Sequence, residues 1–233
     1  MQVNLINEKL ADDILNQETR KIVKSHIKYM EQNNIDILCI SDSEYPSDLR
    51  QIYSPPINLY TLGNKKALNC NNIAMVGCRE YSNYGKQMAE NIAYNLSKNK
   101  INIVSGLAKG IDSFSHLGAI YAKGITTAVL ANGLDTIYPK ENIYLAKKIL
   151  DSNGLIISEY PLGTKPDKLN FPARNRIISG ISKGIIVVEA KKKSGTLITV
   201  DFALDQGREV FVVPRKYKFT KFRRNKWFNK TRC

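Results

Sequence analysis

The sequence has few residues of the kinds on which metal sites and disulfide scaffolds depend. Among its 233 residues are four cysteines and two histidines, and no two cysteines form a Cys-x-x-Cys pair. A disulfide scaffold and a zinc site therefore have no support. His26 and His116 lie in helical patterns without a serine, aspartate or cysteine partner at a recognisable spacing, so we expect neither a catalytic triad nor a bound metal.

Long apolar stretches are also absent. No run of apolar residues approaches the roughly 20 that a membrane-spanning helix needs. The chain starts with MQVNLINEKLADD, which carries acids where a secretory signal needs a basic and then an apolar segment. We therefore expect a cytoplasmic protein that does not contact a membrane.

Two nucleotide-binding motifs are missing as well. The chain contains neither Gly-x-x-x-x-Gly-Lys-[Ser/Thr] nor Gly-x-Gly-x-x-Gly. The first motif cradles the phosphates of a hydrolysed nucleotide, and the second binds the pyrophosphate of a dinucleotide. Their absence argues against P-loop hydrolysis and dinucleotide redox chemistry, and we expect no cofactor.

Acidic residues are lacking from the last part of the chain. Residues 215–233 contain nine Lys and Arg and no Asp or Glu, within a chain whose formal net charge is +14. Removing these nine from the 35 basic residues leaves 26 against 21 acids, a charge of only +5 over residues 1–214. The total charge favours a polyanionic partner, but most of it belongs to this tail.

Short apolar runs and helical patterns alternate along most of the chain. Apolar residues make up 43% of the sequence, enough for a sizeable core. From Ile73 onward strand and helix alternate without a break, which is typical of an α/β domain with a doubly wound, mostly parallel sheet. We expect its strands at residues 73–76, 101–104, 126–131, 155–158, 185–189 and 209–213.

We predict three segments. Residues 1–44 form an N-terminal helical segment, in which residues 37–40 are a candidate strand. Residues 45–214 form a Rossmann-like domain, and residues 215–233 form a separate basic tail.

Three loops that follow predicted strands are suited to anions. The first begins at Gly77, the second runs from Ser105 to Asp112, and the third contains Ser194-Gly195-Thr196. In an open parallel sheet such strand-to-helix turns meet at the carboxyl edge, where free backbone N–H groups and helix N-termini favour phosphate. Arg79 and Lys109 add positive charge there.

Seven groups of short motifs are spread over residues 45–214. They are Tyr45-Pro46 with Pro56, Leu59-Tyr60 and Gly63; Gly77-x-Arg79-x-x-Ser82-x-Tyr84-Gly85; Ser105-Gly106-x-Ala108-x-Gly110-Ile111-Asp112; Asn132-Gly133-Leu134-Asp135 with Tyr138-Pro139; Ser158-Glu159-Tyr160-Pro161; Phe171-Pro172-x-Arg174-Asn175-Arg176; and Ser194-Gly195-Thr196-Leu197-Ile198-Thr199. In this order the motifs resemble those of the DprA/Smf family, the DNA-processing proteins of bacterial natural transformation. One motif alone would be weak evidence, whereas seven in register are strong.

The resemblance implies a protein that binds single-stranded DNA without acting as an enzyme, protects incoming strands from nucleases and helps to load the recombinase RecA. It implies an extended Rossmann-like fold behind a partial sterile-alpha-motif-like segment. Matching motifs carry DNA contacts over to Arg79, Lys168, Phe171 and Arg174. The expected DNA-binding set is completed by Gly77, Ser82, Gly106, Lys109, Gly110, Asn175, Ser194, Gly195 and Thr196.

Several of these residues also have an ordinary structural interpretation. Arg79 could pair on the surface with Glu80 or Asp112 instead of gripping a phosphate. Phe171 could pack on Ile177 as a staple at a helix start instead of stacking on an unpaired base. The glycines could serve the turns themselves, and the serines and threonine could simply cap helices.

We expect a helix to begin at Ile177, just after Arg174 and Arg176. Cations beside the positive end of a helix dipole are unfavourable unless an anion joins them, which favours a ligand, although Arg176 could pair internally with Glu159 or Asp112. The acids Asp112, Asp135 and Glu159 could be imagined as a pair for glycoside chemistry, but caps or arginine partners account for them more economically.

The main alternative function is an enzyme or sensor of small nucleotides, because related Rossmann-like folds use the same edge for nucleoside monophosphates. The Gly-Gly-x-Gly-Thr-x-x-Glu motif of the phosphoribohydrolase relatives is absent, since Lys193-Ser194-Gly195-Thr196 lacks the paired glycines and the following acid. The register of the motifs favours DNA.

We expect the tail from Arg215 to Cys233 to be the product of a shifted reading frame that begins after Val213-Pro214, where the family resemblance stops. Back-translated with A/T-rich codons and read one nucleotide later, it can yield a Ser-x-Gly-x-Asn-x-Leu-Ile pattern like that of the family. In that case the segment that helps to form the family's homodimer and its RecA-facing surface is lost. The alternative is a genuine basic arm that folds on nucleic acid.

Overall fold

A computed structural model describes residues 16–191 and 194–214 of the chain. Its centre is one eight-stranded sheet. The strands are β1 (Ile35–Cys39), β2 (Asn58–Gly63), β3 (Asn72–Gly77), β4 (Asn102–Ser105), β5 (Thr126–Val129), β6 (Leu155–Ser158), β7 (Gly184–Glu189) and β8 (Glu209–Val212). Their order across the sheet is β1-β2-β6-β5-β4-β3-β7-β8. The pairs from β6 to β8 are parallel, whereas β2 is antiparallel to both β6 and β1.

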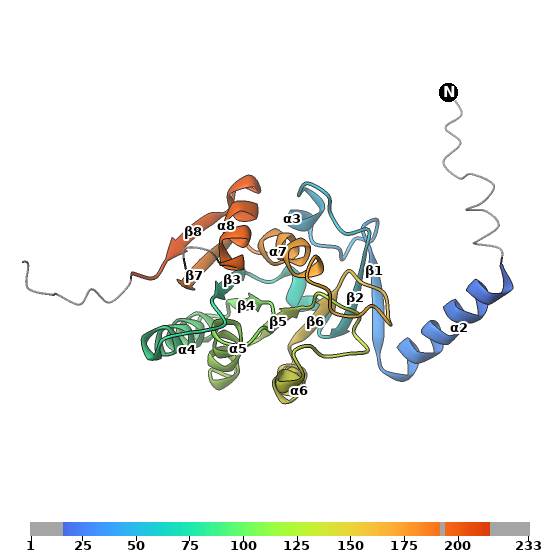
Figure 1. The fold of residues 1–233 in the computed structure, drawn as a ribbon, viewed down its shortest axis with the longest axis horizontal. Coiled ribbons are helices and arrows are strands. Elements are labelled where there is room, and N and C mark those ends of the chain that lie inside the picture. The colour runs from blue at the N-terminus through green and yellow to red at the C-terminus, as the bar shows by residue number, and fades with distance from the viewer. Residues whose placement is uncertain (1–15, 192–193, 215–233) are drawn as a thin grey trace, which may run out of the picture.

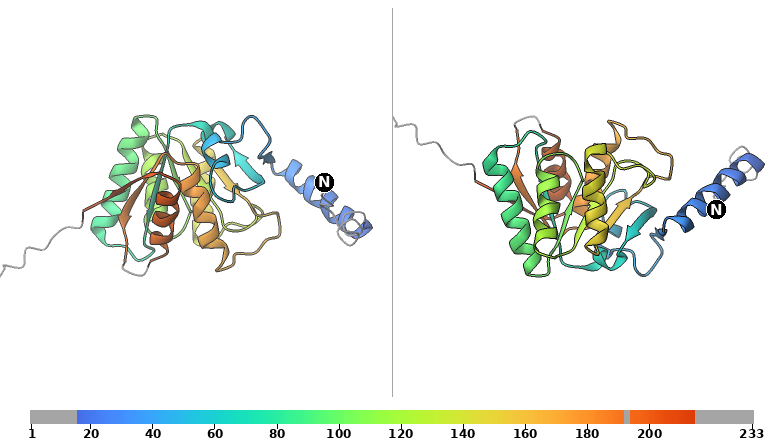
Figure 2. Two further views of the ribbon diagram at one scale, coloured as in Figure 1. Left: turned by 90° about the horizontal axis from the view of Figure 1, so that it is seen from above. Right: turned by 90° about the horizontal axis from the view of Figure 1, so that it is seen from below.

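Helices lie on both sides of this sheet. The described helices are α2 (Gln17–Gln32), α3 (Ser47–Arg50), α4 (Asn83–Lys98), α5 (Ile111–Tyr121), α6 (Ile143–Asp151), α7 (Asn170–Gly180) and α8 (Gly195–Asp205), with 3₁₀ turns η1 (Lys65–Asn69) and η2 (Lys140–Asn142). Figures 1 and 2 show α3, α7 and α8 over one face and α4, α5 and α6 over the other. The result is a three-layer α/β/α domain.

The core forms on both faces because the central strands are buried on both sides, even where they carry polar residues such as Asn102, Thr126 and Thr127. Every residue of β4, β5 and β6 is buried, as expected of parallel strands covered by helices on both sides. In β3, Ala74 and Val76 join the cluster that contains residues of α7 and α8. Met75 lies between them in sequence and packs instead with Ala89 and Ala93 of α4. The alternation follows from the two-residue repeat of a strand.

The connections create a crevice between two neighbouring strands. The chain leaves β3 into α4 on one face, and it leaves the adjacent strand β7 into α8 on the other face (Figure 1). Where the connections from two neighbouring strands go to opposite faces of the sheet, the loops at the carboxyl ends of those strands separate and leave an opening. Open α/β sheets bind their ligands in such an opening.

The predicted fold class, a doubly wound and mostly parallel α/β sheet of the Rossmann-like kind, is confirmed. Each of the six predicted strands is present within two residues at either end. Two details differ. The candidate strand at residues 37–40 is β1, which pairs with β2, so the sheet begins before the predicted domain boundary at residue 45. The helix predicted from Ile177 begins at Asn170.

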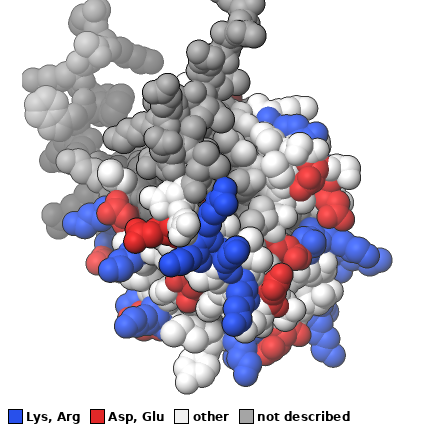
Figure 3. Space-filling model, turned by 90° about the vertical axis from the view of Figure 1, so that its right-hand side faces the viewer, with Lys and Arg blue, Asp and Glu red and all other residues white. Residues whose placement is uncertain are grey.

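The helical segment before the sheet is represented by α2. Asn16 caps it by accepting a hydrogen bond from the Glu18 backbone N–H at 2.8 Å, and Met30 is its one buried residue. α2 projects from the body (Figures 1 and 2), and Lys and Arg side chains gather on the same side of the molecule (Figure 3). The first fifteen residues lie outside the described part. None of the described helices is long and apolar enough to span a membrane.

Candidate nucleic-acid interface

The loop after β3 presses closely on the start of α5. A Cβ atom on Gly77 would lie 2.6 Å from the side chain of Ile111. Gly110 has φ +85°, and a Cβ there would lie 2.5 Å from the carbonyl oxygen of Cys78 and 2.6 Å from that of Arg79. Packing within the protein therefore accounts for both glycines, and this close fit places Arg79 at the end of β3 with its side chain exposed.

A cleft of about 360 Å³ opens at the crevice between β3 and β7. Its walls are the loop after β3, the start of α5, the start of α7 and the start of α8. The predicted site residues that line it are Gly77, Arg79, Phe171, Arg174, Asn175, Ser194, Gly195 and Thr196. The structure thus brings together eight of the thirteen residues that the sequence singled out.

Arg79 and Phe171 meet at the mouth of this cleft. The guanidinium carbon of Arg79 lies 5.5 Å from the centre of the Phe171 ring, a cation–π contact. The two acids that we considered as partners for Arg79 are engaged elsewhere, because Glu80 pairs with Lys191 and the Asp112 carboxylate accepts backbone N–H groups. Arg79 therefore presents its charge to solvent with no ion pair among the described residues.

Phe171 lies inside α7, as its second residue, rather than before the helix. The staple interpretation required Phe171 to precede the helix, so it does not fit. The ring of Phe171 instead faces Tyr138 from the loop after β5, with 5.7 Å between ring centres and an angle of 50° between the planes. Sequence reasoning quoted Tyr138 as part of a motif but gave it no role.

Arg174 forms the floor of the cleft and is only 5% exposed. Its Nη1 atom donates to the carbonyl oxygens of Gly106, at 2.9 Å, and Val129, so it joins the ends of β4 and β5. Burial lowers the pKa of Arg174 to about 10, and the nearby Asp112 carboxylate opposes this shift. All of its described contacts are internal, and a contact between Arg174 and DNA stays a prediction.

Asp112 supports the same floor. Its carboxylate accepts the backbone N–H of Gly106 at 3.1 Å and that of Ala108 at 3.4 Å. Burial raises the pKa of Asp112, while Arg174 acts in the opposite direction. A Cβ atom on Gly106 would lie 2.7 Å from Arg174 Nη2, so this glycine makes room for the arginine. These contacts agree with the interpretation of Asp112 as a structural acid.

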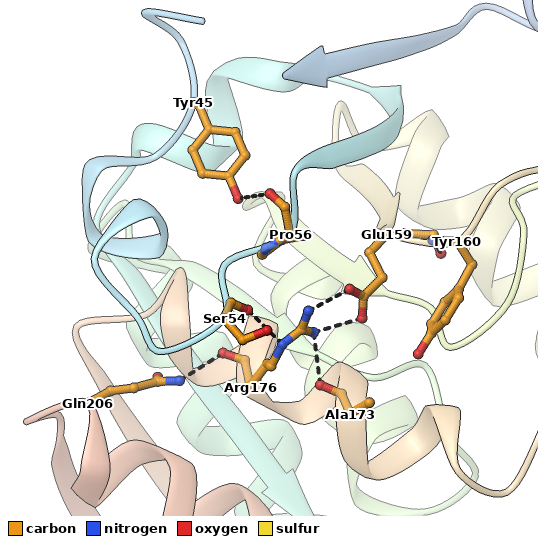
Figure 4. Close-up of polar contacts among 9 residues, drawn as sticks. Tyr45, Ser54, Pro56, Glu159, Tyr160, Ala173, Arg176 and Gln206 are labelled. Carbon is orange, nitrogen blue, oxygen red and sulfur yellow. Dashed lines mark hydrogen bonds and ion pairs between the residues drawn. The ribbon is translucent and has the colours of Figure 1, made fainter. Parts of the chain in front are cut away.

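Arg176 is internal, as one of our two interpretations held (Figure 4). It pairs with Glu159 through two hydrogen bonds of 2.7 and 2.5 Å and donates to the carbonyl oxygen of Ser54 at 3.0 Å. Gln206, which follows the last residue of α8, donates to the carbonyl oxygen of Arg176 at 3.1 Å. One side chain and its backbone thus connect α7 to the end of β6, to the loop before β2 and to α8.

Two predicted serines act as helix caps. Ser82 accepts the Gly85 N–H at 3.0 Å at the start of α4, and its own hydroxyl and N–H donate to Glu189. Ser194 accepts the Thr196 N–H at 3.2 Å at the start of α8. A Cβ on Gly195 would meet open space. The α8 cap faces the cleft, whereas Ser82 does not line it.

The remaining predicted cations lie at the rim. Lys109 is exposed and pairs with Glu141 at 2.6 Å, which lowers the pKa of Glu141. Lys168 is exposed in the loop that precedes α7. Their contacts with DNA stay predictions.

Known proteins resemble this chain in sequence and in fold. The family model for DNA recombination-mediator protein A matches residues 36–231. The chain is 47% identical over 187 residues to the DNA processing protein DprA of Bacillus subtilis, covering 80% of this chain and 62% of that protein. It is 42% identical over 195 residues to the protein Smf of Escherichia coli, covering 84% and 52%. The chain thus spans between half and two thirds of the length of these curated relatives.

Two solved structures resemble the fold closely. The X-ray structure of DprA from Streptococcus pneumoniae has a TM-score of 0.75 and 38% identity, covering 91% of this chain and 76% of that chain. A structure that describes the single-stranded DNA binding mode of DprA from Helicobacter pylori has a TM-score of 0.72 and 32% identity, covering 79% and 82%. Because the family model matches residues 36–231, which are most of this chain, the chain belongs to the DNA recombination-mediator protein A family.

Proposed function

We propose that this chain binds single-stranded DNA along the cleft at the carboxyl edge of its sheet and acts in DNA processing for transformation and recombination. The observation that carries the proposal is the pair formed by Arg79 and Phe171. An exposed guanidinium without an ion pair among the described residues stands beside an aromatic ring at the mouth of the cleft. Such a pair supplies the two contacts, phosphate and base face, that single-strand binders combine.

The same pair favours single strands over duplex and predicts little sequence preference. The face of a base is available for stacking only when the base is unpaired, and every base has such a face. Phosphate contacts carry no sequence information. The Helicobacter pylori relative, whose structure describes a single-stranded DNA binding mode, supports this choice of partner.

Binding, and not catalysis, is the proposed activity. The acids that could have formed a catalytic pair are engaged in structural contacts, Asp112 with two backbone N–H groups and Glu159 with Arg176. Among the described residues that line the cleft, no hydroxyl or thiol side chain hydrogen-bonds to a side chain that could act as its base. The alternative of a small-nucleotide enzyme therefore has no residue set to carry it within the described part of the chain.

We also propose that the bound strand is protected from nucleases and passed to RecA in the cytoplasm. The family description as a recombination mediator supports this role. The predicted loss of the family's homodimer surface concerns residues after Pro214, which lie outside the described part.

The proposal is tested by titrating the full chain with single-stranded and double-stranded oligonucleotides of equal length at several salt concentrations. We expect tighter binding to the single strand and weaker binding as salt rises. Equal affinity for duplex would contradict the proposal. A nucleoside monophosphate that displaces the oligonucleotide at low concentration would favour the small-nucleotide alternative.

A further inference from the structure

A smaller hollow of about 180 Å³ lies beside the main cleft. Arg79 and Phe171 line both, so the two hollows share a wall. The other side of the smaller hollow is formed by Lys109, Tyr138 and Pro139. It therefore combines two aromatic rings with two cations and adjoins the place where the proposed phosphate contact occurs.

Tyr138 is held in this wall by the backbone of its own loop. The Asn132 side chain donates to the carbonyl oxygens of Gly133 and Thr136, at 2.9 and 2.6 Å, and Ser158 donates to the carbonyl oxygen of Asn132 at 2.7 Å. These bonds fix the turn after β5 without using the Tyr138 side chain. The ring is thus presented from a supported turn and is itself free to contact a ligand.

The two rings differ in what already covers them. The guanidinium of Arg79 lies 5.5 Å from the centre of the Phe171 ring, so a base that stacks on Phe171 shares that ring with Arg79. Tyr138 touches Phe171 at a tilt and is 40% exposed, with no cation over its ring among the described residues. Tyr138 therefore offers the more open aromatic surface of the pair.

We infer that the smaller hollow takes an unpaired nucleobase and that Tyr138 is its stacking residue, next to the phosphate bound by Arg79. The inference rests on the proposed function, since it adds one base subsite to the same strand. Recognition is by the flat face of a purine or pyrimidine, so the subsite accepts any base. The ring is required for this contact and the hydroxyl is not.

The test compares two oligonucleotides of equal length, one of thymidines and one in which every base is missing, against the full chain. Tyr138→Ala should weaken binding of the thymidine strand by roughly 5- to 150-fold, the range that stacking on one aromatic side chain covers. Binding of the abasic strand should not change, and neither should the salt dependence, because stacking releases no counterions. Tyr138→Phe should bind both strands as the unmodified chain does.

Tyr121→Ala is the matched control, because Tyr121 is 62% exposed at the far end of α5, away from the carboxyl edge. If Tyr138→Ala lowers the thermal midpoint, Tyr138→Leu keeps an apolar side chain there and should show the same selective loss.

An unchanged affinity for thymidines, or an equal loss on both strands, overturns the inference and makes Tyr138 a packing residue. So does an unmodified chain that binds both strands equally well, which would leave single-stranded DNA binding through phosphate contacts intact but would also remove the base contact proposed for Phe171. An unmodified chain that binds neither strand contradicts the proposed function itself, and the base subsite with it.

Discussion

At the scale of the residue, the basic side chains of the interface differ in whether they are exposed and unpaired, paired with an acid, or buried. Arg79 is exposed without an ion pair in the described part of the chain, whereas Lys109 and Lys191 pair with glutamates and Arg174 is buried. The sequence shows four basic residues and cannot distinguish them, because their partners come from distant loops. Of these four residues, Arg79 should therefore contribute most to the electrostatic part of binding.

Replacing Arg79 with alanine should reduce the slope of log K against log salt by about 0.7, the value for one lost phosphate contact on a single strand. The measurement is the dissociation constant of the full chain for a single-stranded oligonucleotide at several salt concentrations. Lys183→Ala, an exposed cation just before β7 at the opposite edge of the sheet, is the control and should leave the slope alone. An unchanged slope in Arg79→Ala would make Arg79 an ordinary surface residue.

His116 gives the fold a pH dependence that does not involve the cleft. It is fully buried in α5, with Nδ1 2.7 Å from the Thr126 hydroxyl and Nε2 without a partner among the described residues. Burial, and to a lesser degree Arg174, lower the pKa of His116 from 6.5 to about 3. Below pH 6.5 the unfolded chain binds a proton that the folded chain refuses, so stability should fall as the pH falls toward 3.

His116→Gln should flatten this dependence by up to roughly 1.4 kcal/mol per pH unit, since glutamine does not titrate. The free energy of unfolding in urea, measured for both proteins at several pH values below 6.5, checks it. Carboxylates such as Glu80 titrate equally in both proteins and cancel in the difference. Parallel curves for the two proteins would show that His116 is not the group responsible.

At the scale of the element, the strands were predictable and the start of α7 was not. The strands appear in the sequence as short apolar runs because both of their faces are buried. Phe171-Pro172 was taken as loop, yet Pro172 lies in the first turn of α7, where its missing N–H has no intrahelical partner to lose. A proline there is compatible with helix, so its presence could not mark the boundary.

The position of α7 should depend on the pair formed by Arg176 and Glu159. Arg176→Ala leaves a half-buried carboxylate without its partner and should lower the free energy of unfolding by about 3 kcal/mol. Lys109→Ala, which breaks an exposed pair, should change it by less than about 1 kcal/mol. Urea denaturation measures both, and equal small changes would show that the buried pair does not hold α7.

At the scale of the whole molecule, the sequence placed the site at the carboxyl edge but could not supply all of its neighbours. A parallel sheet brings the ends of all its strands to one edge, so the loops after β3, β4 and β7 were expected together. The contact between Tyr138 and Phe171 depends on how the loop after β5 meets the start of α7, and no local pattern encodes that meeting.

The prediction that the basic tail arose from a shifted reading frame concerns the whole chain. The tail itself lies outside the described residues. The family model matches up to residue 231, past Pro214, so the expectation that the resemblance stops there is not met. We still expect the gene sequence to show a family-like continuation one nucleotide out of frame after Val213-Pro214. Codons that give no such continuation would end the idea. The tail would then be the first segment to test for DNA binding, by comparing the full chain with one that stops at Pro214.

The projecting helix α2 has a consequence for how this molecule can evolve. It shares only Met30 with the core, and the cleft lies among β3, β4 and β7, well separated along the sheet from β1. Changes in α2 therefore touch almost none of the contacts that position the cleft, and distant changes of this kind act independently. We therefore expect α2 to tolerate substitution or replacement while selection on the cleft continues undisturbed.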